Sequence, residues 1–464
     1  MSLPPGRSTP TSLRLAALAA LFTFSVCVIS WPGFMSFDSM YALRQARTGI
    51  ETGGYPPMVS YLWALCEKVV PGQGGMFVLQ NALVFLGVAA LGRALGAGEL
   101  RIFVAMLVIA LVPATLGPML VVWKDVVFGG LMALAYALTL RYLEGRRRAT
   151  LAAAVLLLAV ASSFRLNGVA AAVPAIAAIA WTICGAFTPW SNPGASRIAA
   201  QVGRQRLLAG ALLFVLLLGG IFGFVFLTAT WRLPDLKRIQ MATGNAGTQV
   251  HDLIGMSVCT GRNLLPPGLY SGEMTPERLR ELYHPEHSQL SLGSPPLLED
   301  SALAANAQLV ETLAATARVE HPSCYLRHRA RMFLYTMGAN AGSVFYLTQP
   351  DVFPGEAGTQ MVPTTLTRRT VDYLLSYDSS WFARSFCLAL LAVGALAVGI
   401  RGDHRSRAWK ALLPMAGACT YLIGSFFVLP GADARYNFWA NLVFIVTFCS
   451  VLPGIKAMTS SARR

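Results

Sequence analysis

Apolar residues dominate long stretches of this chain, and polar residues gather at the ends of those stretches. A run of roughly 20 apolar residues can cross the hydrocarbon of a bilayer as a helix. About ten such runs recur by this criterion, centred on Leu21, Phe85, Leu107, Ala133, Leu157, Ala177, Leu216, Leu391, Leu422 and Phe444. We therefore predict an all-α polytopic membrane protein with about ten transmembrane helices.

The first and the third of these apolar runs each allow a more specific prediction. Only Arg7 and Arg14 precede the first run, and no small-residue cleavage site accompanies it, so we expect a retained helix and not a removed signal peptide. Two prolines between Pro113 and Trp123 predict that the third run does not continue as one straight helix.

Composition and charge agree with this class. The 464 residues are 55% hydrophobic and only 13% charged, and the mean hydropathy is +0.54, as expected of a chain solvated mostly by lipid. Arginine clusters such as Arg146 to Arg148 recur in alternate connections. The positive-inside rule places these connections and both termini in the cytoplasm. The net charge of +15 is then a topology signal, and nucleic acid is not expected as a partner.

Two segments are too polar and too long to be short connections. The first outer loop, 33–75, is predicted to hold interfacial helices near 41–47 and 59–70. The segment 231–380 is predicted to be an outer-face, periplasmic domain of mixed structure between helices 7 and 8. We therefore divide the chain into an N-terminal transmembrane module (1–230), the outer-face domain (231–380) and C-terminal transmembrane helices (381–464).

The cysteines give one specific expectation. Six of the eight lie in or beside apolar runs, whereas Cys259 and Cys324 fall in the outer domain. An oxidising outer compartment permits a disulfide between these two, and a pair of free buried thiols is the alternative. No Cys or His spacing resembles a zinc site.

Charged residues at the predicted outer ends of helices are the candidates for chemistry, because charge near lipid is costly. One is Asp38, which could alternatively be a helix cap. Another is the pair Lys124-Asp125, which could alternatively be an interfacial lysine bound to its neighbour.

The remaining candidates are Arg165 with Asn167, between two apolar runs, and Arg435 in the last outer loop, where a local pair with Asp433 is the alternative. Three bases and an acid on one membrane face could hold a lipid-linked phosphate beside a general base.

These stretches resemble the GT-C superfamily of polytopic glycosyltransferases. The resemblance rests on Asp38 followed by Tyr55-Pro56-Pro57-Met58, and on Trp123-Lys124-Asp125 and Arg165-Leu166-Asn167-Gly168. It implies that Asp38 is the catalytic base and that Lys124, Arg165 and Arg435 bind the donor phosphate. Tyr55, Asp125 and Asn167 would then position sugar or acceptor hydroxyls.

The sequence also departs from the family pattern. Many members have a second acid after the first, whereas Ser39 follows Asp38, and Tyr55 stands where histidine is common. We assign no residue as a metal ligand, and a divalent cation, Mg²⁺ or Mn²⁺, stays open as a cofactor.

The resemblance predicts an inverting glycosyltransferase of the bacterial inner membrane, with its active site facing the periplasm. It would move a sugar from a polyprenyl-phosphate donor to a glycan, lipid or protein acceptor of the cell envelope, such as lipopolysaccharide. The alternatives are an O-antigen or polysaccharide ligase or polymerase, and a lipid-linked sugar transporter or flippase. A transporter would be expected to show acids or broken helices near mid-membrane, and this sequence has almost none.

Overall fold

The structure is a computed structural model that describes residues 10–49, 56–165, 167–186, 204–230, 235–270, 273–285, 300–339, 361–377, 380, 384–402 and 404–452. Within these ranges the regular elements are helices, and one isolated parallel bridge joins Phe34 to Val121.

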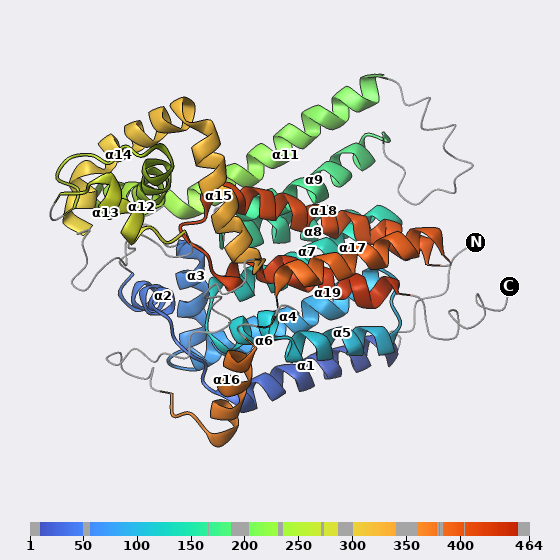
Figure 1. The fold of residues 1–464 in the computed structure, drawn as a ribbon. Coiled ribbons are helices and arrows are strands. Elements are labelled where there is room, and N and C mark those ends of the chain that lie inside the picture. The colour runs from blue at the N-terminus through green and yellow to red at the C-terminus, as the bar shows by residue number, and fades with distance from the viewer. Residues whose placement is uncertain are drawn as a thin grey trace.

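The body of the molecule is a bundle of apolar helices that lie side by side (Figure 1). These are α1 (Pro10–Ser30), α4 (Gly74–Ala94), α5 (Glu99–Leu111), α6 (Pro113–Leu120), α7 (Lys124–Gly145), α8 (Arg148–Ser162), α9 (Gly168–Ile183), α11 (Arg204–Thr230), α17 (Ser385–Arg401), α18 (Arg405–Val428) and α19 (Phe438–Val451). Each predicted centre of an apolar run lies in one of them. The chain is thus a multi-pass membrane protein.

Length divides the apolar helices into two groups. Five described helices, α1, α4, α7, α11 and α18, are long and apolar enough to cross a membrane, or six when the bent pair α5 and α6 counts as one. Helices α8, α9 and α17 are apolar but shorter. The count of ten spans and the cytoplasmic location of the termini stay predictions.

The predicted break after the third run is present. Helices α5 and α6 meet at an angle of 68°, and Val112 between them is extended, with φ −71° and ψ 124°. A residue before proline avoids the helical conformation, so Pro113 ends α5 and begins α6.

Helix α7 lies at the centre of the bundle and packs against α4, α8, α9 and α19. Its closest approach is to α4, where a methyl group on Gly130 would lie 2.6 Å from the Leu83 backbone and one on Gly87 would lie 2.7 Å from the Gly130 carbonyl. Glycine at both positions allows the two backbones to approach, as at many membrane helix contacts. This contact fixes the start of α7, which carries Lys124.

The bundle has two distinct ends. Arg14 of α1 pairs with Glu99 at 3.8 Å, and Arg101 donates to the Ser450 carbonyl of α19 at 2.7 Å. The start of α1 and the end of α19 therefore lie at the same end, the right end in Figure 1.

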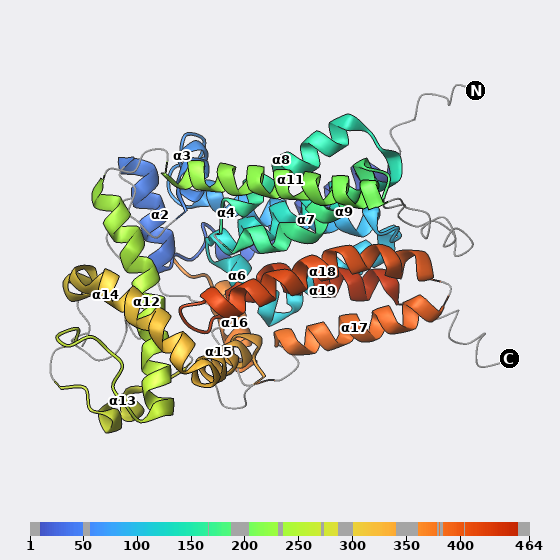
Figure 2. The same cartoon turned by 90° about the horizontal axis from the view of Figure 1, so that it is seen from above.

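The opposite end carries the remaining α-helices (Figures 1 and 2). These are α2 (Phe37–Thr48), α3 (Pro57–Glu67), α12 (Asp235–Thr260), α13 (Pro276–Leu282), α14 (Asp300–Glu320), α15 (Pro322–Met337) and α16 (Thr365–Ser376). Helices α2 and α3 agree with the two interfacial helices predicted in the first outer loop.

The described part of 231–380 has a separate apolar core, which includes Val250, Leu279 and Val310. A disulfide joins Cys259 of α12 to Cys324 of α15, with their Cα atoms 5.7 Å apart. The regular elements described in this segment are helices, so the expectation of mixed structure is wrong for these residues. The domain boundaries themselves stay predictions.

Candidate active site

The first turn of α2 presents Asp38. Ser36 is the N-cap residue, and its hydroxyl accepts a hydrogen bond from the Ser39 amide at 3.3 Å, while the Ser39 hydroxyl accepts one from the Ser36 amide at 3.1 Å. This reciprocal arrangement is a capping box. The alternative interpretation of Asp38 as the helix cap is therefore wrong, because a serine fills that role.

Backbone pairing brings the start of α2 beside the start of α7. The Phe34 amide donates to the Leu120 carbonyl and the Val122 amide donates to the Phe34 carbonyl, both at 2.9 Å. The Ser39 hydroxyl donates to the Val122 carbonyl at 2.6 Å. Asp38 and Lys124 are thereby held on adjoining segments.

Asp38 lies between two cations from distant parts of the chain. Its Oδ2 is 2.7 Å from Nη1 of Arg435, in the short helix η4 (Ala434–Asn437), and 3.8 Å from Nζ of Lys124. The Asp38 side chain is 31% exposed, compared with 16% for Lys124 and 11% for Arg435. The acid is therefore the most accessible of the three groups.

The two cations determine the protonation state of Asp38. Burial alone would raise its pKa, but the charges of Arg435 and Lys124 outweigh this effect and lower the pKa to about 2. Asp38 is consequently a carboxylate at every physiological pH.

Aromatic rings contact both arginines of this cluster. The Arg435 guanidinium lies 4.8 Å from the ring centre of Trp123 and 5.2 Å from that of Tyr436, and Arg165 lies 5.0 Å from the same Tyr436 ring. Trp123 is fixed in turn, because its Nε1 donates to the Ser36 hydroxyl at 2.7 Å. Tyr436 thus connects the two arginines through cation–π contacts.

Arg435 has a second acidic partner. Its Nε lies 3.0 Å from Oδ2 of Asp433, and Oδ1 of Asp433 accepts from the Arg435 amide at 3.0 Å. The local pair considered from the sequence therefore exists, but the same guanidinium also reaches Asp38.

Arg165, Asp125 and Asn167 form a buried group beside this cluster. Arg165 makes an ion pair with Asp125, and both side chains are less than a tenth exposed. Arg165 Nε donates to Asn167 Oδ1 at 3.1 Å, and Asn167 Nδ2 donates to the Ser425 hydroxyl of α18 at 2.9 Å. In this structure the contacts of Asp125 and Asn167 therefore hold Arg165 in place.

The structure thus brings Asp38, Lys124 and Arg435 into direct contact and places the Arg165 group next to them. Tyr55 lies outside the described residues. Sequence reasoning assigned no role to Tyr436, Trp123 or Ser425. Tyr436 and Trp123 could have been found from the sequence, because each is the immediate neighbour of a candidate lysine or arginine. Ser425 lies within an apolar run, and no sequence pattern marks it as part of the site.

The acids present do not fit a divalent cation. Asp38 and Asp433 both face the guanidinium of Arg435, and Asp38 also faces Lys124. In the described part of the chain no three His, Cys, Asp or Glu side chains gather. We therefore derive no step through a metal.

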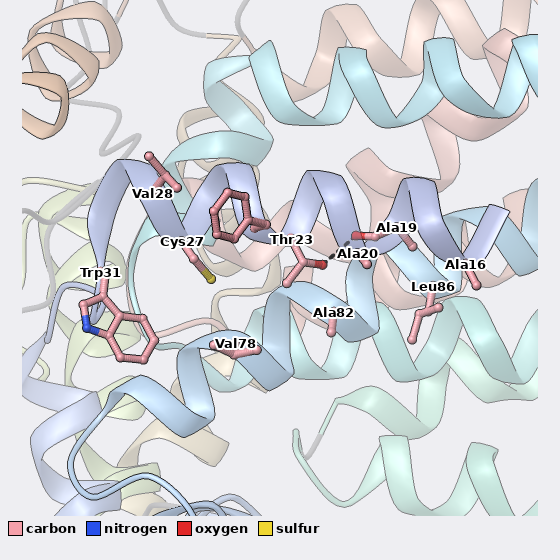
Figure 3. Close-up of a pocket in the computed structure, with 11 residues that line it drawn as sticks. Ala16, Ala19, Ala20, Thr23, Cys27, Val28, Trp31, Val78, Ala82 and Leu86 are labelled. Atoms are coloured by element: carbon pink, nitrogen blue, oxygen red, sulfur yellow. Dashed lines mark hydrogen bonds between the residues drawn. The ribbon is translucent and has the colours of Figure 1, made fainter. Parts of the chain in front are cut away.

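A groove of about 640 Å³ runs along the flank of the bundle between α1 and α4 (Figure 3). Small and apolar side chains line it, with Trp31 at one end and Ala16 at the other. Trp31 packs directly on Gly74, where a methyl group would lie 2.6 Å from its ring. None of the described residues that line this groove is charged.

Comparison with known proteins gives structural likenesses only. The sequence matches no protein-family model and no curated protein sequence. The archaeal oligosaccharyltransferase AglB from Archaeoglobus fulgidus, in complex with an inhibitory peptide and a dolichol-phosphate, is similar at 12% identity and a TM-score of 0.40, over 94% of this chain and 50% of AglB. The arabinosyltransferase EmbB from Mycobacterium smegmatis is similar at 16% identity and a TM-score of 0.36, over 95% of this chain and 44% of EmbB.

ArnT from Cupriavidus metallidurans bound to undecaprenyl phosphate is similar at 14% identity and a TM-score of 0.32, over 91% of this chain and 78% of ArnT. The chain spans about half the length of AglB and less than half that of EmbB. At these identities and TM-scores the likenesses assign neither a family nor an activity to this chain.

Proposed function

We propose that this protein is a membrane glycosyltransferase that moves a sugar from a polyprenyl-phosphate donor to an acceptor of the cell envelope. Transfer takes place at the periplasmic face of the bacterial inner membrane, and Asp38 is the general base.

The observation that carries this proposal is the contact of Asp38 with both Lys124 and Arg435 at one end of the bundle. Three separate elements, α2, α7 and η4, supply these groups. A partly exposed carboxylate between two less exposed cations is suited to a reaction in which the acceptor hydroxyl loses a proton and the leaving phosphate gains negative charge.

The charge balance of the reaction matches the two cations. A sugar linked through one phosphate to a polyprenol carries a single negative charge, and the polyprenyl phosphate that leaves carries up to two. The acceptor oxygen forms a bond to the anomeric carbon, and the bond from that carbon to the phosphate oxygen breaks with its electron pair. Lys124 and Arg435 stabilise the charge that develops on this oxygen, so they bind the transition state more tightly than the donor.

Donor binding also explains how Asp38 becomes a useful base. With a pKa of about 2, the carboxylate has little affinity for a proton while both cations contact it. A bound phosphate competes for Lys124 and Arg435 and offsets their positive charge, which raises the pKa of Asp38. The carboxylate then accepts the proton of the acceptor hydroxyl as that oxygen attacks, a contribution of roughly 10²- to 10⁴-fold.

The neighbouring residues have supporting roles in this proposal. Arg165 lies on the Tyr436 ring that also contacts Arg435, so it adds positive charge on the same side of the donor. Asp125 and Asn167 hold Arg165, and Tyr55 contacts sugar or acceptor hydroxyls. Attack opposite the leaving phosphate inverts the anomeric carbon.

The test is transfer by the purified protein in lipid nanodiscs. Radiolabelled sugars are offered on polyprenyl monophosphate and, separately, on polyprenyl pyrophosphate, together with cell-envelope extract as acceptor. We expect label in the acceptor from a monophosphate donor, and inhibition by unlabelled polyprenyl phosphate. Transfer from the pyrophosphate donor alone would favour the ligase or polymerase. In a parallel assay with sealed proteoliposomes, movement of the intact lipid-linked sugar between leaflets without transfer would favour the flippase.

A further inference from the structure

Helix α15 holds both ends of the loop that carries Arg435. At the beginning of this loop, Arg329 Nη1 donates to the Leu429 carbonyl at 2.7 Å. At its end, Asn437 Nδ2 donates to the Thr336 carbonyl at 2.6 Å and to the Ser385 hydroxyl at 3.1 Å. The only side-chain group of α15 in these contacts is the guanidinium of Arg329.

Arg329 is buried and is fixed from the outer domain. Its residue is 1% exposed, its Nε lies 2.7 Å from Oδ1 of Asp252 on α12, and its Nη2 donates to Oδ2 of Asp252 at 2.8 Å. The planar guanidinium therefore contacts both carboxylate oxygens and the Leu429 carbonyl at once. A lysine could not make all three contacts, because its ammonium is a compact point charge.

The loop from Leu429 leads directly into Asp433 and Arg435. Asp433 accepts from the Arg435 amide and pairs with its side chain, and Arg435 reaches Asp38. Asp252 is therefore linked to Asp38 through Arg329, the backbone from Leu429 to Asp433, and Arg435.

We propose that Arg329 is a positioning residue: held by Asp252, it fixes the Leu429 carbonyl and thereby aims Arg435 at Asp38. This inference rests on the proposed function for its effect on catalysis.

The variants Arg329→Lys and Asp252→Asn test this inference. Asp252 also lies 3.8 Å from Arg318 and 3.4 Å from His328, so Arg329→Lys does not leave it without a cationic neighbour. Arg278→Lys is the matched control, because Arg278 is half-exposed on α13 and its ion pair within the described residues is the local one with Glu281. Elution profile and thermal unfolding in detergent establish that each variant is folded.

Two measurements are made on the folded variants. Hydrogen exchange of the peptide 429–437 reports the loop without any reference to activity. Transfer kinetics are compared among Arg329→Lys, Arg435→Lys and the double variant, since residues that act through one another have non-additive effects.

We expect faster exchange in 429–437 for Arg329→Lys and Asp252→Asn, and no change for Arg278→Lys. We expect kcat to fall about tenfold in Arg329→Lys with an unchanged KM for the acceptor, and the double variant to be no slower than Arg435→Lys alone. Unchanged exchange in 429–437, or losses that multiply in the double variant, would overturn the inference. If the wild type transfers no sugar, the proposed function fails while the exchange measurement still decides whether Arg329 fixes the loop.

Discussion

Replacing Arg435 by methionine separates its role in catalysis from a role in donor binding. The side chain keeps much of the length needed to pack on Trp123 and Tyr436, but it removes the charge that lies 2.7 Å from Asp38 and 3.0 Å from Asp433. Arg435→Lys keeps a positive charge but lacks the planar guanidinium. Arg278→Met, on the surface of α13, is the control.

The expected loss of rate in Arg435→Met follows from the negative charge that develops on the leaving phosphate. Two unit charges about 4 Å apart interact with about 4 kcal/mol at an effective dielectric constant near 20. Loss of a single preorganised donor to a developing oxyanion typically costs about 3 to 4 kcal/mol, or roughly 10²- to 10³-fold in kcat. We expect a loss of this size in Arg435→Met and about a tenfold loss in Arg435→Lys.

Single-turnover transfer with excess protein and a radiolabelled donor measures the chemical step directly. Two results would refute this reasoning. One is a rate within about threefold of wild type in folded Arg435→Met. The other is a weaker KM for the donor with an unchanged rate at saturation, which would mean that Arg435 binds donor and transition state equally.

Three further predictions follow from the same geometry. Asp125→Asn should destabilise the protein by about 3–5 kcal/mol, because it leaves the buried Arg165 without its ion-pair partner; thermal unfolding in detergent checks this, and a melting temperature equal to wild type would contradict it. Since the pKa of Asp38 is lowered from 3.8 to about 2, the stability it contributes is present above pH 4 and lost as the pH falls through 2. The pH dependence of kcat/KM for the donor reports the ionisation of the free enzyme. It should therefore show no loss of activity from protonation of Asp38 above pH 5. A loss of kcat/KM in this range whose midpoint shifts in Asp38→Glu would contradict the prediction. Cys259→Ser should destabilise the outer domain by about 4 kcal/mol, because the disulfide closes a segment with a sequence separation of 65; proteolysis of that domain should accelerate, and an unchanged cleavage rate would count against a stabilising bridge.

The sequence predicted the helices of the bundle well, because apolar runs of membrane length have few other folded forms. It predicted the break at Pro113 for an equally local reason. The number of spans was harder to predict, since α8, α9 and α17 are apolar yet shorter than a full crossing. The helical structure of the outer domain was not predicted, because the Pro and Gly residues of this segment favour loops and breaks, whereas the Ala-rich and Leu-rich stretch 300–320 forms α14.

The ion pairs within the candidate site were harder to predict from the sequence than the helices. Lys124 and Asp125 are neighbours on a helix and point in different directions, so a local pair was the weaker interpretation. Ser36 takes the cap position considered for Asp38 from the sequence, and the contacts of Ser36 with Trp123 and of Ser39 with Val122 hold the first turn of α2 in this register. The contact of Asp38 with Arg435 depends on tertiary packing across almost the whole chain, and no local pattern encodes it.

The most direct test of the central claim is the chemical step in Asp38→Asn at saturating donor. The exposed acid Asp372 of α16 provides the matched control, Asp372→Asn. Donor binding is measured in parallel through displacement of labelled polyprenyl phosphate. We predict that Asp38→Asn binds the donor at least as well as wild type and transfers the sugar about 10²- to 10⁴-fold more slowly, while Asp372→Asn behaves as wild type. Full transfer by folded Asp38→Asn would contradict the assignment of Asp38 as the base.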